Sequence, residues 1–301
     1  MRFPEAGRRC VVYIGEETDK GFQARGTGFL VEVERANRTL KYYLVTAHHV
    51  IRRLPEPSRF SIRINHKSEK SHNLRSFGRW RWWRHSDRSV DAAVYPWSLD
   101  VVEYPHSAFQ IDKYFVKPDP TGERGIGVGD PIYMVGLFRT LAGSDKITPM
   151  VRSGNIAMMA SEPFRTKYYG DALYHWIETF SLKGFSGSPV FARETIGTKL
   201  DKKKGNDAQW LRGHGDLYLL GLVHGILPLR VLDELTGVRD SKQVWHSGIT
   251  MVVPAHLIME ILNRPELLEY EKHIMKEPGE REKTATSLGG PKNARHSHSA
   301  N

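Results

Sequence analysis

Short apolar segments separated by turn residues recur from residue 9 to residue 254, and they dominate the pattern of this chain. β-Branched and aromatic residues are frequent in these segments, which is typical of strands. A first series comprises residues 9–15, 28–33, 41–46, 60–65 and 91–96, and a second comprises residues 130–136, 150–159, 174–180, 188–192, 217–225 and 248–253. Closure into barrels removes the exposed edges of such sheets. The sequence therefore predicts an all-β fold with two six-stranded antiparallel β-barrels.

The two series predict two barrels in tandem, followed by a helix. Apolar residues recur at helical spacing only after Pro254. The predicted parts are an N-terminal β-barrel (residues 1–108), a polar linker (109–129), a C-terminal β-barrel (130–254), a C-terminal helical segment (255–276) and a disordered tail (277–301). The tail is predicted to be disordered because it holds almost no apolar residues.

Composition excludes several kinds of site. Cys10 is the one cysteine, so the chain cannot form an internal disulfide or a site built from several cysteines. No apolar run approaches the ~18 residues of a membrane-spanning helix, and no membrane partner is predicted. The first 17 residues lack the apolar core of a signal peptide, so a cytoplasmic location is expected. Neither a phosphate-binding glycine loop with its lysine nor an HExxH motif occurs, and we predict no cofactor and no metal site.

Most of the net charge of +10 belongs to residues 51–88, which hold 11 Lys and Arg against 3 Asp and Glu. Trp80, Trp82 and Trp83 alternate with arginines in this segment. Such a pattern can bind nucleic acid or another polyanion. It can equally be a strand pair with tryptophans in the core and arginine stems over apolar surface. We favour the structural interpretation because no nucleic-acid-binding motif accompanies the charge.

Three strings of residues carry the chemistry of the chain. They are Thr46-Ala47-His48-His49-Val50, Asp91-Ala92-Ala93-Val94 and Gly184-Phe185-Ser186-Gly187-Ser188. Taken alone, a histidine at a strand end or an aspartate that opens a strand is usually structural. A serine between glycines on a tight turn, in contrast, projects its hydroxyl and exposes backbone amides. Together the strings supply the nucleophile, the base, the orienting carboxylate and the oxyanion donors of a serine hydrolase.

The same strings resemble the chymotrypsin-like (trypsin-like) serine peptidase family, and more narrowly its disulfide-free bacterial domains. The resemblance covers residues 8–262 and extends to Gly26-Thr27-Gly28-Phe29 and to residues 221–225 and 248–254. It implies barrels of the chymotrypsin-like type, and the order His, Asp, Ser agrees with that family. The implied site consists of Ser186 as nucleophile, His49 as general base and acid, Asp91 as its orienting partner, and the amides of Gly184 and Ser186 as oxyanion hole.

Two of these roles have an alternative residue. His48 is the alternative base, and Asp87 is the alternative carboxylate. The resemblance favours His49 because the family's histidine directly precedes the valine. Asp87 lies in a polar turn and lacks the apolar strand that should follow it.

Substrate contacts are also implied by the resemblance. Phe180 stands six residues before the serine, which predicts an apolar pocket and cleavage after a medium or large apolar residue. The strand segment His224, Gly225 and Ile226 is expected to pair with the substrate backbone. Phe185 replaces the acidic residue that digestive relatives pair with a newly cut N-terminus, so activation by such insertion is not expected.

The predicted function is a serine endopeptidase that acts on a protein or peptide through an acyl-enzyme. Two alternatives stay open. One is a catalytically silent relative that binds a peptide or partner protein, and the other is a basic polyanion-binding protein.

Overall fold

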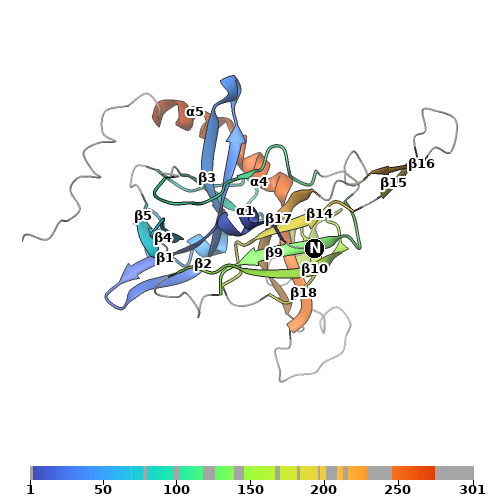
Figure 1. Ribbon diagram of the computed structural model, residues 1–301, viewed down its shortest axis with the longest axis horizontal. Helices are drawn as coiled ribbons and strands as arrows, with labels where there is room; N and C mark the ends of the chain where they lie inside the picture. Colours follow the sequence, from blue (N-terminus) through green and yellow to red (C-terminus); the bar gives the residue numbers. More distant parts are fainter. Residues whose placement is uncertain are drawn as a thin grey trace, which may run out of the picture. The chain divides into compact units, whose positions relative to one another are not determined.

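The computed structural model describes residues 3–68, 70–76, 80–97, 102–117, 126–138, 146–166, 170–181, 184–195, 197–200, 209–212, 216–228 and 246–274 (Figure 1). The chain divides into a compact unit, Met1–Leu262, and a second unit that contains helix α5 (Pro265–Ile274). The predicted disordered tail, residues 277–301, lies outside the described residues. Within the described part, none of the helices is long and apolar enough to cross a membrane.

The N-terminal half of the first unit is an eight-stranded sheet. In hydrogen-bonded order its strands are β5 (Ser71–Arg75), β4 (Ser61–Asn65), β1 (Val11–Thr18), β2 (Gly21–Glu34), β3 (Leu40–Thr46), β7 (Ala93–Pro96) and β6 (Trp83–Arg84), and β8 (Phe109–Gln110) pairs with β2. Helix α1 (Glu5–Arg9) precedes β1, a 3₁₀ turn (Ala36–Arg38) joins β2 to β3, and helix α2 (His48–Ile51) follows β3. In β4, Ile62 and Ile64 are buried and Arg63 reaches the surface, as alternation predicts for a half-buried strand.

This first sheet corrects the prediction of two closed barrels. Among the described residues its path stays open, with β5 at one end and β6 at the other. Strand β6 has only two residues, Trp83 and Arg84, so it offers few backbone groups to a further neighbour. Among the described residues the half that carries His49 is therefore an open sheet.

The C-terminal half confirms the prediction of a closed six-stranded antiparallel barrel. Around the barrel the strands are β10 (Met150–Met158), β13 (His175–Glu178), β18 (His246–Pro254), β17 (Leu217–Pro228), β14 (Pro189–Arg193) and β9 (Pro131–Gly136). Val190 pairs with Met134 and Ala192 with Ile132 across β14 and β9, and all four side chains lie in the barrel core. Two hairpins extend from this half, β11 (Phe164–Thr166) with β12 (Gly170–Ala172), and β15 (Gly197–Leu200) with β16 (Gln209–Arg212).

Tryptophans of the basic segment pack against the core of the first sheet. The ring centroid of Trp82 lies 4.9 Å from that of Phe60 and 5.1 Å from that of Tyr95. Trp83 is buried, and the guanidinium of Arg81 lies 4.2 Å from the centre of its ring. These contacts agree with the structural interpretation of the basic segment, in which arginines cover aromatic surface.

Helix α4 (Ala255–Leu262) starts directly after β18 and buries one apolar face. Leu257, Ile258, Ile261 and Leu262 are the buried residues that the spacing predicts. The fold is thus mostly β, with helices at the C-terminal end.

Candidate active site

His49 lies on the single turn of helix α2, immediately after β3. Ala47 and Val50 on either side of the histidine pair are fully buried, and the backbone N–H of Val50 donates to the Ala47 carbonyl at 3.0 Å. This anchoring holds the turn in place and leaves the His49 side chain 24% exposed. The buried residues that flank the histidine pair therefore fix the turn from which His49 reaches the site.

His48 faces in another direction. Its Nε2 lies 3.5 Å from a guanidinium nitrogen of Arg84. Burial first, and then the positive charge of Arg84, lower the pKa of His48. The structure thus brings His49, and not its neighbour, to the carboxylate described next.

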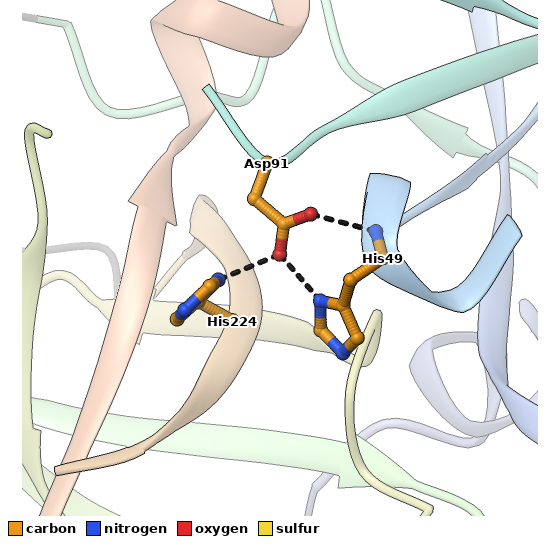
Figure 2. Close-up of side chains that lie close together, drawn as sticks. All are labelled: His49, Asp91 and His224. Atoms are coloured by element: carbon orange, nitrogen blue, oxygen red, sulfur yellow. Dashed lines mark hydrogen bonds and ion pairs between the residues drawn. The ribbon is translucent and has the colours of Figure 1, made fainter. Parts of the chain in front are cut away.

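Asp91 lies just before β7 and binds His49 through both of its oxygens (Figure 2). Oδ1 accepts the backbone N–H of His49 at 2.8 Å, and Oδ2 lies 2.6 Å from Nδ1 of the imidazole. Burial by itself raises the pKa of Asp91, but hydrogen bonds from His224 and His49 outweigh it, so the pKa lies well below its ordinary value. Asp91 is therefore ionised at neutral pH and fixes the orientation of His49.

Asp87, the rival carboxylate, stays in its own turn. It accepts the backbone N–H of Ser89 at 2.8 Å, and this hydrogen bond lowers its pKa. The side chain is exposed, so it serves as a local turn residue.

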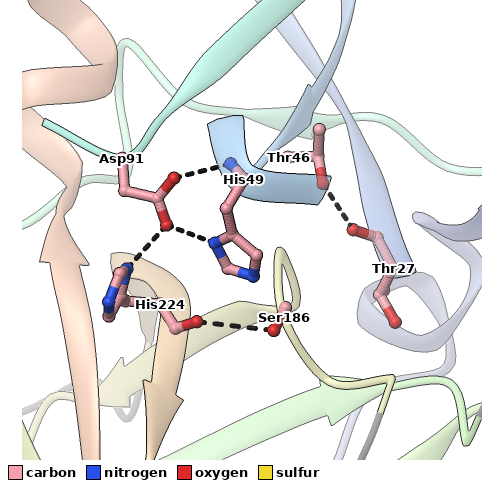
Figure 3. Close-up of polar contacts among 6 residues, drawn as sticks. All are labelled: Thr27, Thr46, His49, Asp91, Ser186 and His224. Atoms are coloured by element: carbon pink, nitrogen blue, oxygen red, sulfur yellow. Dashed lines mark hydrogen bonds and ion pairs between the residues drawn. The ribbon is translucent and has the colours of Figure 1, made fainter. Parts of the chain in front are cut away.

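Ser186 lies on a tight turn between the barrel core and the first sheet (Figure 3). The preceding residue, Phe185, is fully buried in the barrel core and anchors the turn. The following residue, Gly187, has φ +85°. A Cβ at this position would lie 2.2 Å from the Thr27 carbonyl oxygen and 2.3 Å from Thr46 Oγ1, so both conformation and space require glycine.

Thr27 of β2 holds the serine turn against the first sheet. Its backbone N–H donates to the Ser186 carbonyl at 3.0 Å, and its hydroxyl donates to the Gly184 carbonyl at 2.8 Å. The same hydroxyl accepts the backbone N–H of Leu137 at 3.1 Å. Thr27 is fully buried, so these bonds form without competition from water. No role was predicted for Thr27 from the sequence beyond its place in the Gly26-Thr27-Gly28-Phe29 string.

The hydroxyl of Ser186 donates to the backbone carbonyl of His224 at 3.4 Å. Figure 3 shows the His49 ring between Asp91 and Ser186, with Nε2 on the side of the serine. Among the described residues no hydrogen bond joins Ser186 to His49. Catalytic hydrogen bonds are often long in structures without ligand and shorten on substrate binding. The arrangement therefore places the predicted nucleophile on the side of the predicted base, and the hydrogen bond between them is not formed in this structure.

The predicted oxyanion donors lie on the same turn. Gly184 has φ +110°, a conformation that glycine adopts without strain. In the described part of the chain, the backbone N–H groups of Gly184 and Ser186 donate to no other group. The residue before Gly184 lies outside the described residues.

His224 makes a contact that the sequence analysis did not predict. It lies at a bulge of β17, between Val223, which pairs with Val252, and Gly225, which pairs with Met251. Its Nδ1 lies 2.6 Å from Asp91 Oδ2, the same oxygen that binds His49. A bulge redirects a side chain, and without knowledge of the strand register the sequence gives no signal for it.

Strand β17 has a free edge beyond this bulge, at the segment predicted to pair with substrate. Its pairing with β14 runs from Leu217 to Leu222, whereas Gly225 and Ile226 pair only with β18 among the described residues. Phe180, the other predicted substrate contact, follows β13 and is 57% exposed. Its effect on substrate preference stays a prediction.

The fold and the chain order of this site define a class. This chain, in which a sheet carries the histidine and aspartate and a following closed barrel carries the serine, is structurally similar to trypsin-like serine protease domains, including those of the HtrA type.

Two solved structures show this similarity in particular. The apo protease domain of MamO from Magnetospirillum magneticum matches with a TM-score of 0.50 and 14% identity, over 86% of this chain and 99% of that one. The HtrA-type protease AlgW, solved with a decapeptide, matches with a TM-score of 0.50 and 13% identity, over 88% of this chain and 66% of AlgW. These likenesses establish the fold. Neither a scan of protein-family models nor a search of curated proteins finds a match.

Proposed function

We propose that this protein is a serine endopeptidase that cleaves peptide bonds through an acyl-enzyme. The observation that carries the proposal is the pairing of His49 with the ionised, largely buried Asp91, with the second ring nitrogen on the side of Ser186. This pairing selects the tautomer that has a lone pair on Nε2, which a base for the serine hydroxyl requires.

In the acylation step, Ser186 Oγ attacks the carbonyl carbon of the substrate, and His49 Nε2 takes the hydroxyl proton. The resulting imidazolium is stabilised by the Asp91 carboxylate. The negative charge on the former carbonyl oxygen is stabilised by the amides of Gly184 and Ser186. His49 then gives its proton to the leaving amine, and the peptide bond breaks.

In the deacylation step, water replaces the amine. His49 removes a proton from the water, and the resulting hydroxide attacks the carbonyl carbon of the ester. The bond from this carbon to Ser186 Oγ then breaks, His49 returns the proton to Oγ, and the carboxylic acid product leaves. The free edge of β17 at Gly225 and Ile226 supports the entry of an extended peptide as an additional strand.

Labelling with a fluorophosphonate probe tests this proposal. The full chain is expected to bind one probe per molecule, and the Ser186→Ala variant is expected to bind none. Ser188→Ala is the matched control, because Ser188 is a fully buried serine on the same turn. Hydrolysis of a peptide library by the same preparations extends the test from the nucleophile to the full reaction, with strong cleavage after Arg counting against the apolar preference.

The alternatives predict other results. Stable peptide binding without labelling would indicate a silent relative. Salt-dependent retention on DNA or RNA that persists in Ser186→Ala would indicate a polyanion-binding protein. The cytoplasmic location stays a prediction.

A further inference from the structure

Three potential metal ligands meet at Asp91. His49 from helix α2, Asp91 from just before β7 and His224 from the bulge of β17 each offer a donor atom, and these atoms all lie within 4.8 Å of one another. Both Nδ1 atoms lie 2.6 Å from Asp91 Oδ2 (Figure 2). Side-chain exposure is 24% for His49, 11% for Asp91 and 8% for His224. The cluster is therefore largely buried and comes from three separate elements.

The side chain of His224 helps to keep Asp91 ionised, but it takes up no proton in the proposed peptidase reaction. One imidazole on the carboxylate is sufficient to fix the tautomer of the base, and His49 fills that position. The second imidazole is held firmly, because its ring centroid lies 5.0 Å from that of Tyr174 and 5.5 Å from that of His49. A rigid second histidine on the same oxygen thus calls for a separate explanation.

We propose that His49, Asp91 and His224 form a binding site for a Zn²⁺-like transition-metal cation, and that the bound cation inhibits the peptidase. Imidazole nitrogens and carboxylate oxygens are preferred ligands of such cations, and two histidines with one carboxylate leave a fourth position for water. The single negative charge of Asp91 partly balances the cation. The inhibitory effect rests on the proposed function, whereas the binding does not.

The geometry requires only a small adjustment. Ligands at about 2.0 Å from a tetrahedral metal lie about 3.3 Å apart, so the two nitrogens would move away from Oδ2 by less than an ångström. The two ring protons now directed at Oδ2 would move to Nε2, which frees both Nδ1 lone pairs while each imidazole stays neutral.

This exchange explains the inhibition. With the metal on Nδ1, Nε2 of His49 carries the proton and has no lone pair for the hydroxyl of Ser186. Without metal, Asp91 favours the tautomer of His49 with the proton on Nδ1. The bound metal favours the tautomer with the proton on Nε2. Hard cations such as Mg²⁺ prefer oxygen ligands and are not expected to cause the exchange.

Calorimetric titration of the full chain with Zn²⁺ tests the binding. The background is the His296→Ala/His298→Ala double variant, which removes two tail histidines that could bind metal. We expect one Zn²⁺ per chain, no binding of Mg²⁺, and a loss of affinity of about tenfold or more in His224→Ala. His48→Ala, which replaces the neighbour that faces Arg84, is the matched control and should keep the affinity. Undiminished affinity in His224→Ala, or no binding at all, would overturn the site.

Two further readouts separate this proposal from the proposed function. Histidine ring NMR of the Ser186→Ala variant should show the His49 proton move from Nδ1 to Nε2 when Zn²⁺ is added. The rate of fluorophosphonate labelling should fall at least tenfold with saturating Zn²⁺ and be insensitive to Zn²⁺ in His224→Ala. Labelling that fails without metal rejects the peptidase and leaves binding testable. Binding without the tautomer change rejects the proposed inhibition.

Discussion

The open sheet and the closed barrel position their shares of the site in different ways. The sheet presents His49 and Asp91 where strands begin or end, on a one-turn helix and just before β7. The barrel presents Ser186 on a turn anchored by the buried Phe185, and His224 at a bulge within a paired strand. The proposed acid–base pair and the proposed nucleophile thus lie on separate supports. Hydrogen bonds that cross between the two halves hold these residues together, among them those of Thr27 and the contact of His224 with Asp91.

The largest expected effect tests the contribution of the sheet. Asp91→Asn keeps the shape of the side chain and removes the charge, and its amide would favour the wrong tautomer of His49. We expect kcat/KM, or the second-order rate of probe labelling, to fall on the order of 10⁴-fold. Asp87→Asn, an exposed carboxylate in the preceding turn, should leave the rate unchanged. A fall smaller than tenfold would show that the sheet does not supply the acid–base pair.

The next effect tests how closely the barrel turn fits against the sheet. Gly187→Ala places a methyl group against the Thr27 carbonyl, whereas Gly129→Ala, at φ +90°, meets nothing within 4 Å. The second variant measures conformational strain alone, about 1–2 kcal/mol in the free energy of unfolding. We expect Gly187→Ala to cost more than twice as much in chemical denaturation. Equal costs would mean that the two halves are not in close contact at this turn.

The link between the halves is tested by Thr27→Val, which removes the hydroxyl and keeps the shape. The backbone N–H of Leu137 loses its buried acceptor, and the Gly184 carbonyl loses its donor. We expect the free energy of unfolding to fall by about 1–3 kcal/mol, together with a lower labelling rate. Thr18→Val, at an exposed hydroxyl that bonds within its own hairpin, should change stability by less than about 0.5 kcal/mol. A labelling rate that does not change would show that Gly184 is positioned without Thr27.

The smallest effect concerns the barrel alone. Burial lowers the pKa of His175 to about 3, and its ring accepts the backbone N–H of Ala160 at 2.9 Å. An unfolded histidine binds a proton near pH 6.5, so the unfolded state gains protons first and stability falls as the pH decreases. Between pH 7 and 5.5 this contribution is about 1 kcal/mol. Denaturation of His175→Gln across this range should show a smaller pH dependence than the parent chain, and an identical slope would contradict the assignment.

The barrel could be predicted from the sequence more completely than the sheet. All six segments of the second series coincide with the six barrel strands, because each is long enough for its apolar and aromatic residues to be recognised. In the first half, β5, β6 and β8 were not predicted. Ser71–Arg75 holds one apolar residue, and the other two strands have two residues each. These three strands form because they pair with neighbouring strands, and their own composition does not predict them.

The candidate site divides in a similar way. His49, Asp91 and Ser186 stand in local strings whose neighbours are typical of their settings, and the structure brings the first two into contact with the serine nearby. The side-chain contacts of His224 and Thr27 depend on strand register and on the packing of one half against the other. No local pattern encodes such long-range geometry, so these contacts could be found only in the structure.

The hydrogen bonds of Thr27 also relate the formation of the site to the order in which the chain is made and folds. Thr27 precedes Gly184 by 157 positions, so the serine turn receives its support from a strand synthesised long before it. A chain whose synthesis has not reached the barrel contains His49 and Asp91 but not Ser186. A chain whose barrel is unfolded contains Ser186 but does not hold it beside His49. In the proposed peptidase, a newly made molecule therefore has a complete site only when its own folding is complete.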